Sequence, residues 1–499
     1  MAFDPATLSP AQAWEPIAPS QWDDACATHL LRRMGFSAPP AEVARVRQQG
    51  LPATLAAAFD QIRPMPLSGP IADYIAQKPA MIQRGLAAQK AHDAKTLAEV
   101  DDFFQPVRRA AYRSGIELWF EFARAPANSA QENLFLFLSS VLVVAINKID
   151  NPDWIFPYFA LLRESLQRPY PDLCKSLPHT PAMCAYLDLS SSARGIPNEN
   201  YARELMELFT LGEGHYTETD VKEAARALTG FYLQDNQIQF SAARWDPGDK
   251  TLFGRTGPWG ADDVVNLIFT QSSARTWLPT RFLAWYLSDN PVPQPYLETL
   301  GTLWQQQDWR LDSLAKIVLS SKMFYAAAFR GNLIKSPVRY YLGMCQDLGV
   351  DVLPFPSELQ GLLNDCGQDP LNPPNVRGWL GGQLWLNPST WTARRHLLEI
   401  VFTSLPDSAF SAEDFAVLQQ ARARGCGRYF VDPYHFQELA ALPPDQAADR
   451  LVNRFLLGAP ADSYRVALAD YLKNTDDRTN ELLRNAVMDL LASPLYQQC

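Results

Sequence analysis

Residues 198–212 read NENYARELMELFTLG and residues 213–230 read EGHYTETDVKEAARALTG, and together they indicate the fold class. Asn198 or Asn200 can cap a helix at its start, because a short polar side chain accepts hydrogen bonds from the first free amides. Gly212 suits the left-handed conformation that ends many helices. The apolar residues expected to face the core are Leu205, Leu208, Phe209 and Leu228. The segment therefore predicts two helices that meet at a glycine-rich corner.

The first of these helices carries a row of charged residues. Glu199, Arg203 and Glu207 are spaced four residues apart, and Glu204 lies three residues before Glu207. Residues at this spacing share one helix face, so one arginine can pair with several carboxylates. The ordinary interpretation is an exposed ion-pair ladder that contributes little to stability. The alternative is a buried pair of carboxylates beside an arginine, an arrangement that serves acid/base chemistry or cation binding.

Apolar segments of helical period, separated by prolines, occur along the whole chain and predict helices throughout it. The 39 prolines outnumber the 25 glycines and mostly fall between apolar segments of helical period. Proline starts or stops helices far better than it sits inside them. Residues 129–132 (SAQE) have the form of a capping box ahead of the apolar run 134–146, which we expect to be one buried helix. Residues 217–220 (TETD) precede the second helix of the corner in the same way.

One segment has strand character instead. Residues 231–240 (FYLQDNQIQF) alternate apolar and polar side chains on both sides of Asp235-Asn236, a dipeptide that enters left-handed turn conformations. We therefore predict a mainly α, large multi-helix globular fold with one short β-hairpin at 231–240. The main helical domain is predicted to span residues 1–405. Residues 406–499, which are rich in Ala, Leu and Asp, are predicted to form a C-terminal helical cap.

The composition excludes several classes of function. The chain has 499 residues, a net charge of −10 and no block of five or more basic residues, so neither nucleic acid nor an anionic membrane is the expected main partner. The apolar run 134–146 is too short to span a bilayer, which takes about 20 residues. The first residues carry no visible secretory signal, so the default expectation is a cytoplasmic protein, with export by another route left open.

Three tryptophans mark a second candidate site. Trp379, Trp385 and Trp391 recur every six residues through a stretch rich in Gly, Pro and Asn that also contains Arg377. Indole rings beside amides and an arginine are what a sugar or another stacked ligand requires. The alternative is that these rings anchor a long loop to the core, since a six-residue spacing cannot place all three on one face of a regular element.

Four segments resemble the bacterial DUF1800 family, in the same order along the chain. They are the 198–230 segment quoted above, residues 29–36 (HLLRRMGF), residues 181–188 (PAMCAYLD) and residues 373–382 (PPNVRGWLGG). The resemblance covers roughly residues 25–400 and implies a shared fold but little chemistry, because the activity of the family is not established. It also implies a partner, since members are often encoded beside a DUF1501 protein of the alkaline phosphatase-like superfamily.

Three histidines of the family pattern are replaced in this chain. Many relatives carry a central E..ALFWHNHF helix, and aligning it without gaps places Ser139 and Val141 on the two histidines. In the element that resembles HD.G.K..LG, Trp245 stands on the histidine, whereas Asp246 and Lys250 remain. Serine and valine offer neither a nitrogen ligand nor a group that titrates near neutrality. We therefore predict no bound metal and no cofactor.

Two functional hypotheses follow, and whether the protein is an enzyme stays open. The first is a non-catalytic or degenerate helical scaffold that acts with a DUF1501-like partner in envelope or carbohydrate handling. The second is a carboxylate-dependent hydrolase with a site formed by the 198–230 helices and the 373–394 loop. The predicted catalytic residues are Arg203, Glu204, Glu207, Asp246 and Lys250, and the predicted ligand-binding residues are Asn198, Asn200, Arg377, Trp379, Trp385 and Trp391.

Overall fold

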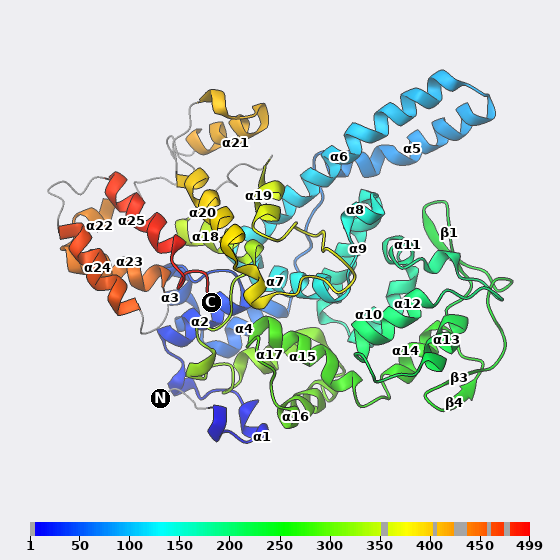
Figure 1. The fold of residues 1–499 in the computed structure, drawn as a ribbon, viewed down its shortest axis with the longest axis horizontal. Coiled ribbons are helices and arrows are strands. Elements are labelled where there is room, and N and C mark those ends of the chain that lie inside the picture. The colour runs from blue at the N-terminus through cyan, green and yellow to red at the C-terminus, as the bar shows by residue number, and fades with distance from the viewer. Residues whose placement is uncertain (1–4, 351–357, 403–406, 424–436, 457–460, 474–479) are drawn as a thin grey trace.

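The computed structural model in Figure 1 describes residues 5–350, 358–402, 407–423, 437–456, 461–473 and 480–499. Most of these residues lie in helices, so the prediction of a mainly α fold is confirmed. The predicted boundary between the main domain and the C-terminal cap, at 405/406, touches residues outside the described ranges.

The elements follow one another along the chain. The first α-helices are α1 (Pro10–Ala13), α2 (Asp24–Met34), α3 (Pro40–Gln49), α4 (Leu51–Phe59), α5 (Pro70–Lys90), α6 (Ala94–Arg124), α7 (Pro126–Val141), α8 (Ile146–Ile149), α9 (Pro152–Glu164), α10 (Tyr170–Ser176), α11 (Pro181–Tyr186), α12 (Glu199–Glu204) and α13 (Glu218–Ala227). The later ones are α14 (Ala261–Ile268), α15 (Ala274–Tyr286), α16 (Gln294–Gln305), α17 (Leu311–Ser320), α18 (Pro337–Leu348), α19 (Leu359–Asp365), α20 (Pro388–Phe402), α21 (Ala412–Ala423), α22 (Gln437–Ala440), α23 (Pro444–Phe455), α24 (Ala461–Lys473) and α25 (Asn480–Ala492). The strands are β1 (Phe231–Gln234), β2 (Gln237–Phe240), β3 (Lys250–Leu252) and β4 (Arg255–Gly257). The short helices are η1 (Pro5–Thr7), η2 (Pro19–Gln21), η3 (Ser165–Gln167), η4 (Leu177–His179), η5 (Leu189–Ser191), η6 (Leu205–Thr210), η7 (Ala327–Phe329), η8 (Gly382–Trp385) and η9 (Asp407–Ala409).

Proline and short polar side chains begin many of these helices. Proline occupies one of the first two positions of α3, α5, α7, α9 and α18, among others. Its missing amide costs nothing there, and its fixed backbone angle already suits a helix. The capping box predicted at Thr217 is confirmed, because the Thr217 hydroxyl accepts the Asp220 amide at 3.1 Å and the Asp220 carboxylate accepts the Thr217 amide at 2.9 Å.

The helix start predicted at Ser129 is wrong. Helix α7 begins three residues earlier, at Pro126, because the proline ring sets the first helical backbone angle. Ser129 lies inside the helix, where its hydroxyl donates to the carbonyl of Ala125 at 3.2 Å. The apolar run 134–146 is buried throughout as expected, but α7 ends at Val141, so the run is not one continuous helix.

The predicted hairpin is present, and the structure adds a second one. Strands β1 and β2 pair antiparallel, and the turn residues Asp235 and Asn236 have φ angles of 50° and 65°. Strands β3 and β4 form another antiparallel pair, so the expectation of a single hairpin is wrong. Each of these strands has only three residues, too few for alternation to show in the sequence. The carboxylate of Asp220 on α13 holds the second hairpin by accepting the amide of Phe253 at 2.7 Å.

The buried helix α7 lies at the centre of the fold. All its residues from Ser129 to Val141 are buried, and it contacts α2, α4, α6, α9 and α15. In Figure 1, α5 and α6 project from the body as a long antiparallel pair, and α10–α14 lie together with the strands on the right. The apolar face of α7 is therefore covered by helices from several distant parts of the chain.

The C-terminal helices pack against this body. Helices α22–α25 lie on the left in Figure 1. Arg394 on α20 donates to the side chain of Gln497 at 2.9 Å, and Arg32 on α2 donates to the carbonyl of Phe455 at 3.1 Å. Buried arginines thus connect the C-terminal residues to α20 and to α2 near the N-terminus.

One buried ion pair crosses the core beside α7. Arg163 on α9 donates to the two carboxylate oxygens of Glu132 at 2.9 and 3.0 Å, and the indole of Trp119 on α6 donates to the same carboxylate at 2.7 Å. The Arg163 and Glu132 side chains are 5% and 1% exposed. Charges buried this deeply are tolerated because they are paired and hydrogen-bonded. Glu132 therefore has a structural role that joins α6, α7 and α9.

Candidate functional site

The 198–212 segment forms α12 followed directly by the π-helical segment η6. The predicted cap is confirmed, because the Asn198 side chain accepts the amide of Asn200 at 2.9 Å. The side-chain amides of Asn198 and Asn200 donate to the carbonyls of Asp188 and Leu187, both at 3.3 Å. These two predicted ligand-binding residues thus fix the start of α12 to the chain after α11.

The packing of this segment largely follows the prediction. Leu205, Phe209 and Leu228 are buried, whereas Leu208 is only partly buried. Gly212 ends the helical segment with a φ of 86°, and a Cβ at this position would lie 2.9 Å from the ring of Trp277. The close approach of α15 and the left-handed backbone both require glycine here. A π-helical turn is rare and frequently accompanies a functional site.

Arg203 makes no hydrogen bond to Glu204 or Glu207, the two carboxylates of the predicted site on its own helical segment. Its guanidinium donates to Glu218 on α13 at 2.8 Å and to Glu199, one turn earlier, at 3.4 Å. The Arg203 side chain is 33% exposed and that of Glu218 is 67% exposed. The hydrogen bond to Glu218 raises the pKa of Arg203. Arg203 is therefore part of an exposed ladder that ties α12 to α13, which was the ordinary interpretation of the charge row.

Glu207 pairs instead with the loop that carries the tryptophans. Arg377 donates to Glu207 at 3.0 Å and to Glu213 at 2.8 Å, and the hydroxyl of Tyr216 donates to the second Glu207 oxygen at 2.6 Å. Burial first, and then this hydrogen bond, raise the pKa of Tyr216. Two motifs far apart in the sequence thus meet through the Arg377–Glu207 ion pair.

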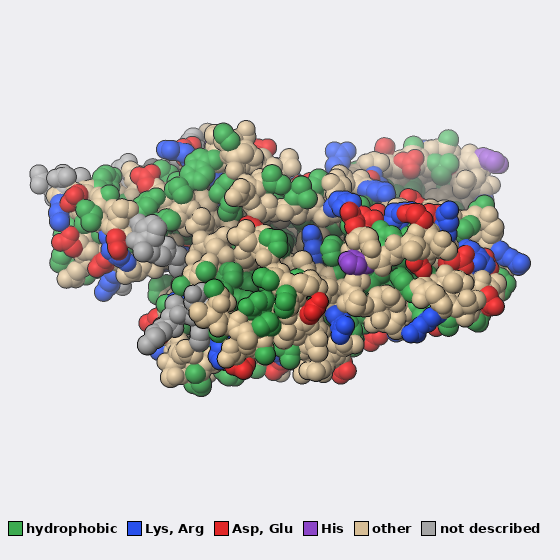
Figure 2. All heavy atoms as spheres, turned by 60° about the horizontal axis from the view of Figure 1, so that its bottom comes forward, with side chains coloured by type: hydrophobic (Ala, Val, Ile, Leu, Met, Phe, Trp, Pro, Cys, Tyr) green, Lys and Arg blue, Asp and Glu red, His purple; other side chains and the backbone are tan. Residues whose placement is uncertain are grey.

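Glu204 is the unpaired carboxylate of this cluster. Across the described part of the chain, no hydrogen bond or ion pair is found for its half-buried side chain. Burial and then the neighbouring Glu207 raise its pKa, while Arg377 and Arg203 act in the opposite direction. In Figure 2 acidic and basic side chains gather on the right-hand part of one face, where α10–α14 lie.

Asp246 and Lys250 form a third, separate cluster. Arg226 on α13 donates to the Asp246 carboxylate at 2.8 Å, and this hydrogen bond lowers the Asp246 pKa. The Lys250 ammonium donates to the carbonyls of Asp246 at 2.6 Å and Gly248 at 2.9 Å. It lies 4.7 Å from the centre of the Trp245 ring. These contacts hold the 246–250 turn against α13, and none of them reaches Glu204 or Glu207.

The hydrogen bonds and ion pairs of the predicted catalytic residues divide them into three groups. Arg203 belongs to the α12–α13 ladder, Glu204 and Glu207 lie beside Arg377, and Asp246 and Lys250 brace a turn. Spacing along one helix brings residues to a common face, but it does not select which neighbouring helix supplies their partners.

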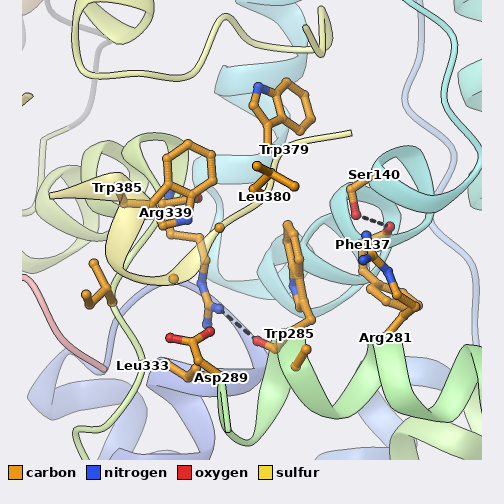
Figure 3. Close-up of a pocket in the computed structure, with 15 residues that line it drawn as sticks. Phe137, Ser140, Arg281, Trp285, Asp289, Leu333, Arg339, Trp379, Leu380 and Trp385 are labelled. Carbon is orange, nitrogen blue, oxygen red and sulfur yellow. Dashed lines mark hydrogen bonds between the residues drawn. The ribbon is translucent and has the colours of Figure 1, made fainter. Parts of the chain in front are cut away.

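Two of the three predicted tryptophans do meet at one cavity, shown in Figure 3. Trp379 and Trp385 line it, whereas Trp391, on α20, is not among the lining residues. A third ring, from Trp285 on α15, completes the aromatic wall, and the volume of the cavity is about 100 Å³. The cavity lies where α7, α15 and the 373–385 loop come together.

Glycines allow the loop to approach α7 this closely. Gly378 has a φ of 76°, and a Cβ there would lie 2.5 Å from the carbonyl oxygen of Ser140, near the end of α7. A backbone carbonyl cannot move aside as a flexible side chain can, so this contact excludes any residue larger than glycine at position 378. Ser140 lines the cavity, and its hydroxyl donates to the carbonyl of Phe137 at 2.7 Å. Gly378 therefore places Arg377 on one side of the contact and Trp379 on the other.

The charged residues of the cavity were not predicted from the sequence. Arg281, Asp289 and Arg339 all line it, as Figure 3 shows. Arg339 is 5% exposed and donates to the carbonyls of Arg33 at 3.0 Å and Trp285 at 3.4 Å. Burial raises the pKa of Asp289 and lowers that of Arg281. The four-residue spacing of Arg281 and Trp285, which puts both on one face of α15, was the available signal.

A larger cavity adjoins this one. It has a volume of about 730 Å³ and is lined by residues 290–293, Tyr296 and Gln383. It shares Asp289 and Ile334 with the tryptophan-lined cavity. The two cavities therefore share part of their walls.

Among the described residues, no three or more His, Cys, Asp or Glu side chains lie together in a way that could hold a metal ion. No helix in the described ranges has the length and apolarity that a membrane crossing requires.

Comparison with known proteins identifies the family but no characterised relative. Neither the curated proteins nor the solved structures contain a match to this chain. The sequence model of the family described as a protein of unknown function, DUF1800, matches residues 29–498. The match extends beyond the segments quoted from the sequence and includes the C-terminal helices. Since it covers nearly the whole chain, this protein belongs to the DUF1800 family.

Proposed function

We propose that this protein is a non-catalytic helical scaffold that binds a saccharide at the tryptophan-lined cavity. The observation that supports the proposal is the convergence of Trp285, Trp379 and Trp385 on one cavity. Indole faces cover the apolar face of a sugar ring, and neighbouring polar groups satisfy its hydroxyls. By contrast, Arg203 and Asp246 are engaged in ion pairs away from this cavity.

Titration of the full-length protein with a panel of neutral and acidic oligosaccharides tests this proposal. Ligand binding to the cavity should change the intrinsic tryptophan fluorescence. Trp379→Ala should weaken binding by about tenfold, since it removes one stacking surface. Trp391→Ala is the matched control, because Trp391 lies in the same stretch of sequence but outside the cavity lining. The absence of binding to every member of the panel would refute the proposal, and so would an equal loss in both variants.

The partner in this proposal is a DUF1501-like protein, which the family resemblance implies. Co-expression followed by affinity purification and size-exclusion chromatography tests it. A complex that elutes together supports the partner, and elution of the two proteins as separate peaks would refute that part of the proposal.

A second candidate function, the carboxylate-dependent hydrolase, has one observation in its favour. The raised pKa of unpaired Glu204 suits a general acid, and Glu207 beside it is paired with Arg377. Assays of glycosidic bond cleavage with Glu204→Gln test this candidate, with Glu199→Gln as the control on the same helix. Turnover that disappears in Glu204→Gln and survives in Glu199→Gln would favour the hydrolase over the scaffold.

A further inference from the structure

Arg281 is a charged residue of the tryptophan-lined cavity that the contacts of the described residues leave unengaged. No hydrogen bond or ion pair is found for its side chain within the described ranges, and burial alone, without a charged neighbour, accounts for its lowered pKa. Arg339 in the same cavity is different, because it donates to backbone carbonyls on α2 and α15. An arginine held partly out of water without a partner costs free energy, which a bound anion would return.

The charged side chains that line the cavity favour an anion. Arg281 and Arg339 are positively charged, and the negative charge of Asp289 is offset by Arg33, which acts to lower the Asp289 pKa. A guanidinium also matches a carboxylate geometrically, since it can donate two parallel hydrogen bonds.

The size and walls of the cavity indicate how such a ligand would lie. About 100 Å³ is the volume of roughly three water molecules, enough for a carboxylate and the adjoining ring atoms but not for a whole oligosaccharide. Figure 3 shows Trp379 and Leu380 together at one side of the cavity, and Leu380 is 79% exposed. Asp289 also lines the neighbouring cavity of about 730 Å³, and its carboxylate can accept a hydrogen bond from a sugar hydroxyl.

We infer that the ligand is an oligosaccharide ending in a carboxylate-bearing sugar, a uronic acid, with its carboxylate bound by Arg281 and its ring against Trp379. The next sugar units follow past Asp289 into the larger cavity. This inference rests on the proposed saccharide-binding function and adds the chemical class of the ligand. It assigns Arg281 as the residue that selects acidic over neutral saccharides.

The test measures affinities of the full-length protein by isothermal titration calorimetry. The probes are four trisaccharides of galactose: one that ends in a single galacturonic acid, neutral galactotriose, and galactotriose with a 6-sulfate or a 6-phosphate on the terminal unit. The trisaccharide that ends in galacturonic acid should bind at least about tenfold more tightly than each other probe. Arg281→Gln should remove this preference through a loss of at least about tenfold, because a hydrogen bond to a charged group is lost. Arg281→Lys keeps the charge and should retain part of the preference.

Arg275→Gln is the matched control for these variants. Arg275 lies on the same helix, α15, but lines a different cavity, so its variant should bind the trisaccharide that ends in galacturonic acid within about twofold of the wild type. Thermal melts establish that each variant is folded before titration. A variant that fails to fold is replaced by Arg281→Met, which preserves much of the side-chain volume.

The outcomes separate this inference from the proposed function. Equal binding of neutral and acidic trisaccharides, weakened by Trp379→Ala but unaffected by Arg281→Gln, would leave saccharide binding standing and overturn the uronic acid assignment. Preference for the sulfate or the phosphate ester would overturn the choice of a carboxylate. Binding of none of the probes would overturn both the inference and the function on which it rests.

Discussion

Replacement of Arg163 by glutamine should destabilise the fold by about 3 to 5 kcal/mol. Arg163 donates to Glu132 at 2.9 and 3.0 Å, and the two side chains are 5% and 1% exposed. Without the guanidinium, the Glu132 carboxylate stays in the core with the Trp119 indole as its remaining donor. One neutral donor does not offset the cost of removing an anion from water. The loss is therefore a large part of a total stability of about 5 to 15 kcal/mol.

Arg203→Gln is the control for this prediction. Arg203 also bridges two elements, but its side chain is 33% exposed and its partner Glu218 is 67% exposed. Water already solvates such a pair, so its loss should cost less than about 1 kcal/mol. This small effect is the outcome expected of an exposed ladder.

Urea unfolding followed by circular dichroism measures both variants, and a double variant strengthens the test. Glu132→Leu combined with Arg163→Met replaces the ion pair by apolar side chains and should recover much of the stability lost in Arg163→Gln. The reasoning would be refuted if Arg163→Gln fell within about 1 kcal/mol of the wild type. It would also be refuted if the double variant were no more stable than Arg163→Gln alone.

Three further predictions concern the loop and two titrating groups. Gly378→Ala should abolish saccharide binding while the circular dichroism spectrum is retained, because its Cβ would lie 2.5 Å from a carbonyl oxygen. Gly195→Ala is the control and should keep binding, since Gly195 also has a positive φ, of 84°, but open space around it. Equal binding by the two variants would contradict the role of the close contact at Gly378. Burial and Glu207 raise the pKa of Glu204 above its ordinary 4.5, so ionisation of Glu204 destabilises the fold as the pH rises above that value. The melting temperature of Glu204→Gln should therefore exceed that of the wild type at about pH 7 but not at about pH 4. Burial lowers the pKa of Lys335 from 10.5 to about 7. Between these two values the unfolded chain binds more protons than the folded one, so the free energy of unfolding rises with pH. Lys335→Met should flatten that rise, and an unchanged dependence of the free energy of unfolding on pH, measured with urea, would contradict the prediction.

The sequence predicted those parts of the fold that short-range contacts decide. The caps at Asn198 and Thr217 and the end at Gly212 depend on residues within a few positions, and all three are present. The cap predicted at Ser129 failed because Pro126, three residues earlier, is the stronger start signal. Local signals are therefore reliable where one candidate stands alone and less so where two compete.

The candidate site could be predicted only in part because long-range packing builds it. Arg377 and Glu207 are 170 positions apart, and no local pattern identifies them as partners. Arg203 had Glu199 and Glu207 at equivalent helical spacing, yet its shorter contacts are to Glu218 on the next helix. Tryptophans in a glycine-rich loop were a usable signal, whereas Arg281 sits in a mixed helical sequence that does not distinguish a cavity from a core.

Two buried residues near the end of α7 lie beside the cavity without lining it. Ser139 and Val141, which the family resemblance places on two histidines of relatives, are 5% and 4% exposed and are absent from the residues that line the cavity. Ser140, between them, does line it. Neighbouring residues on a helix point about 100° apart, so Ser139 and Val141 point to either side of the direction that Ser140 takes. The tryptophan and arginine walls of the cavity are therefore formed without Ser139 or Val141.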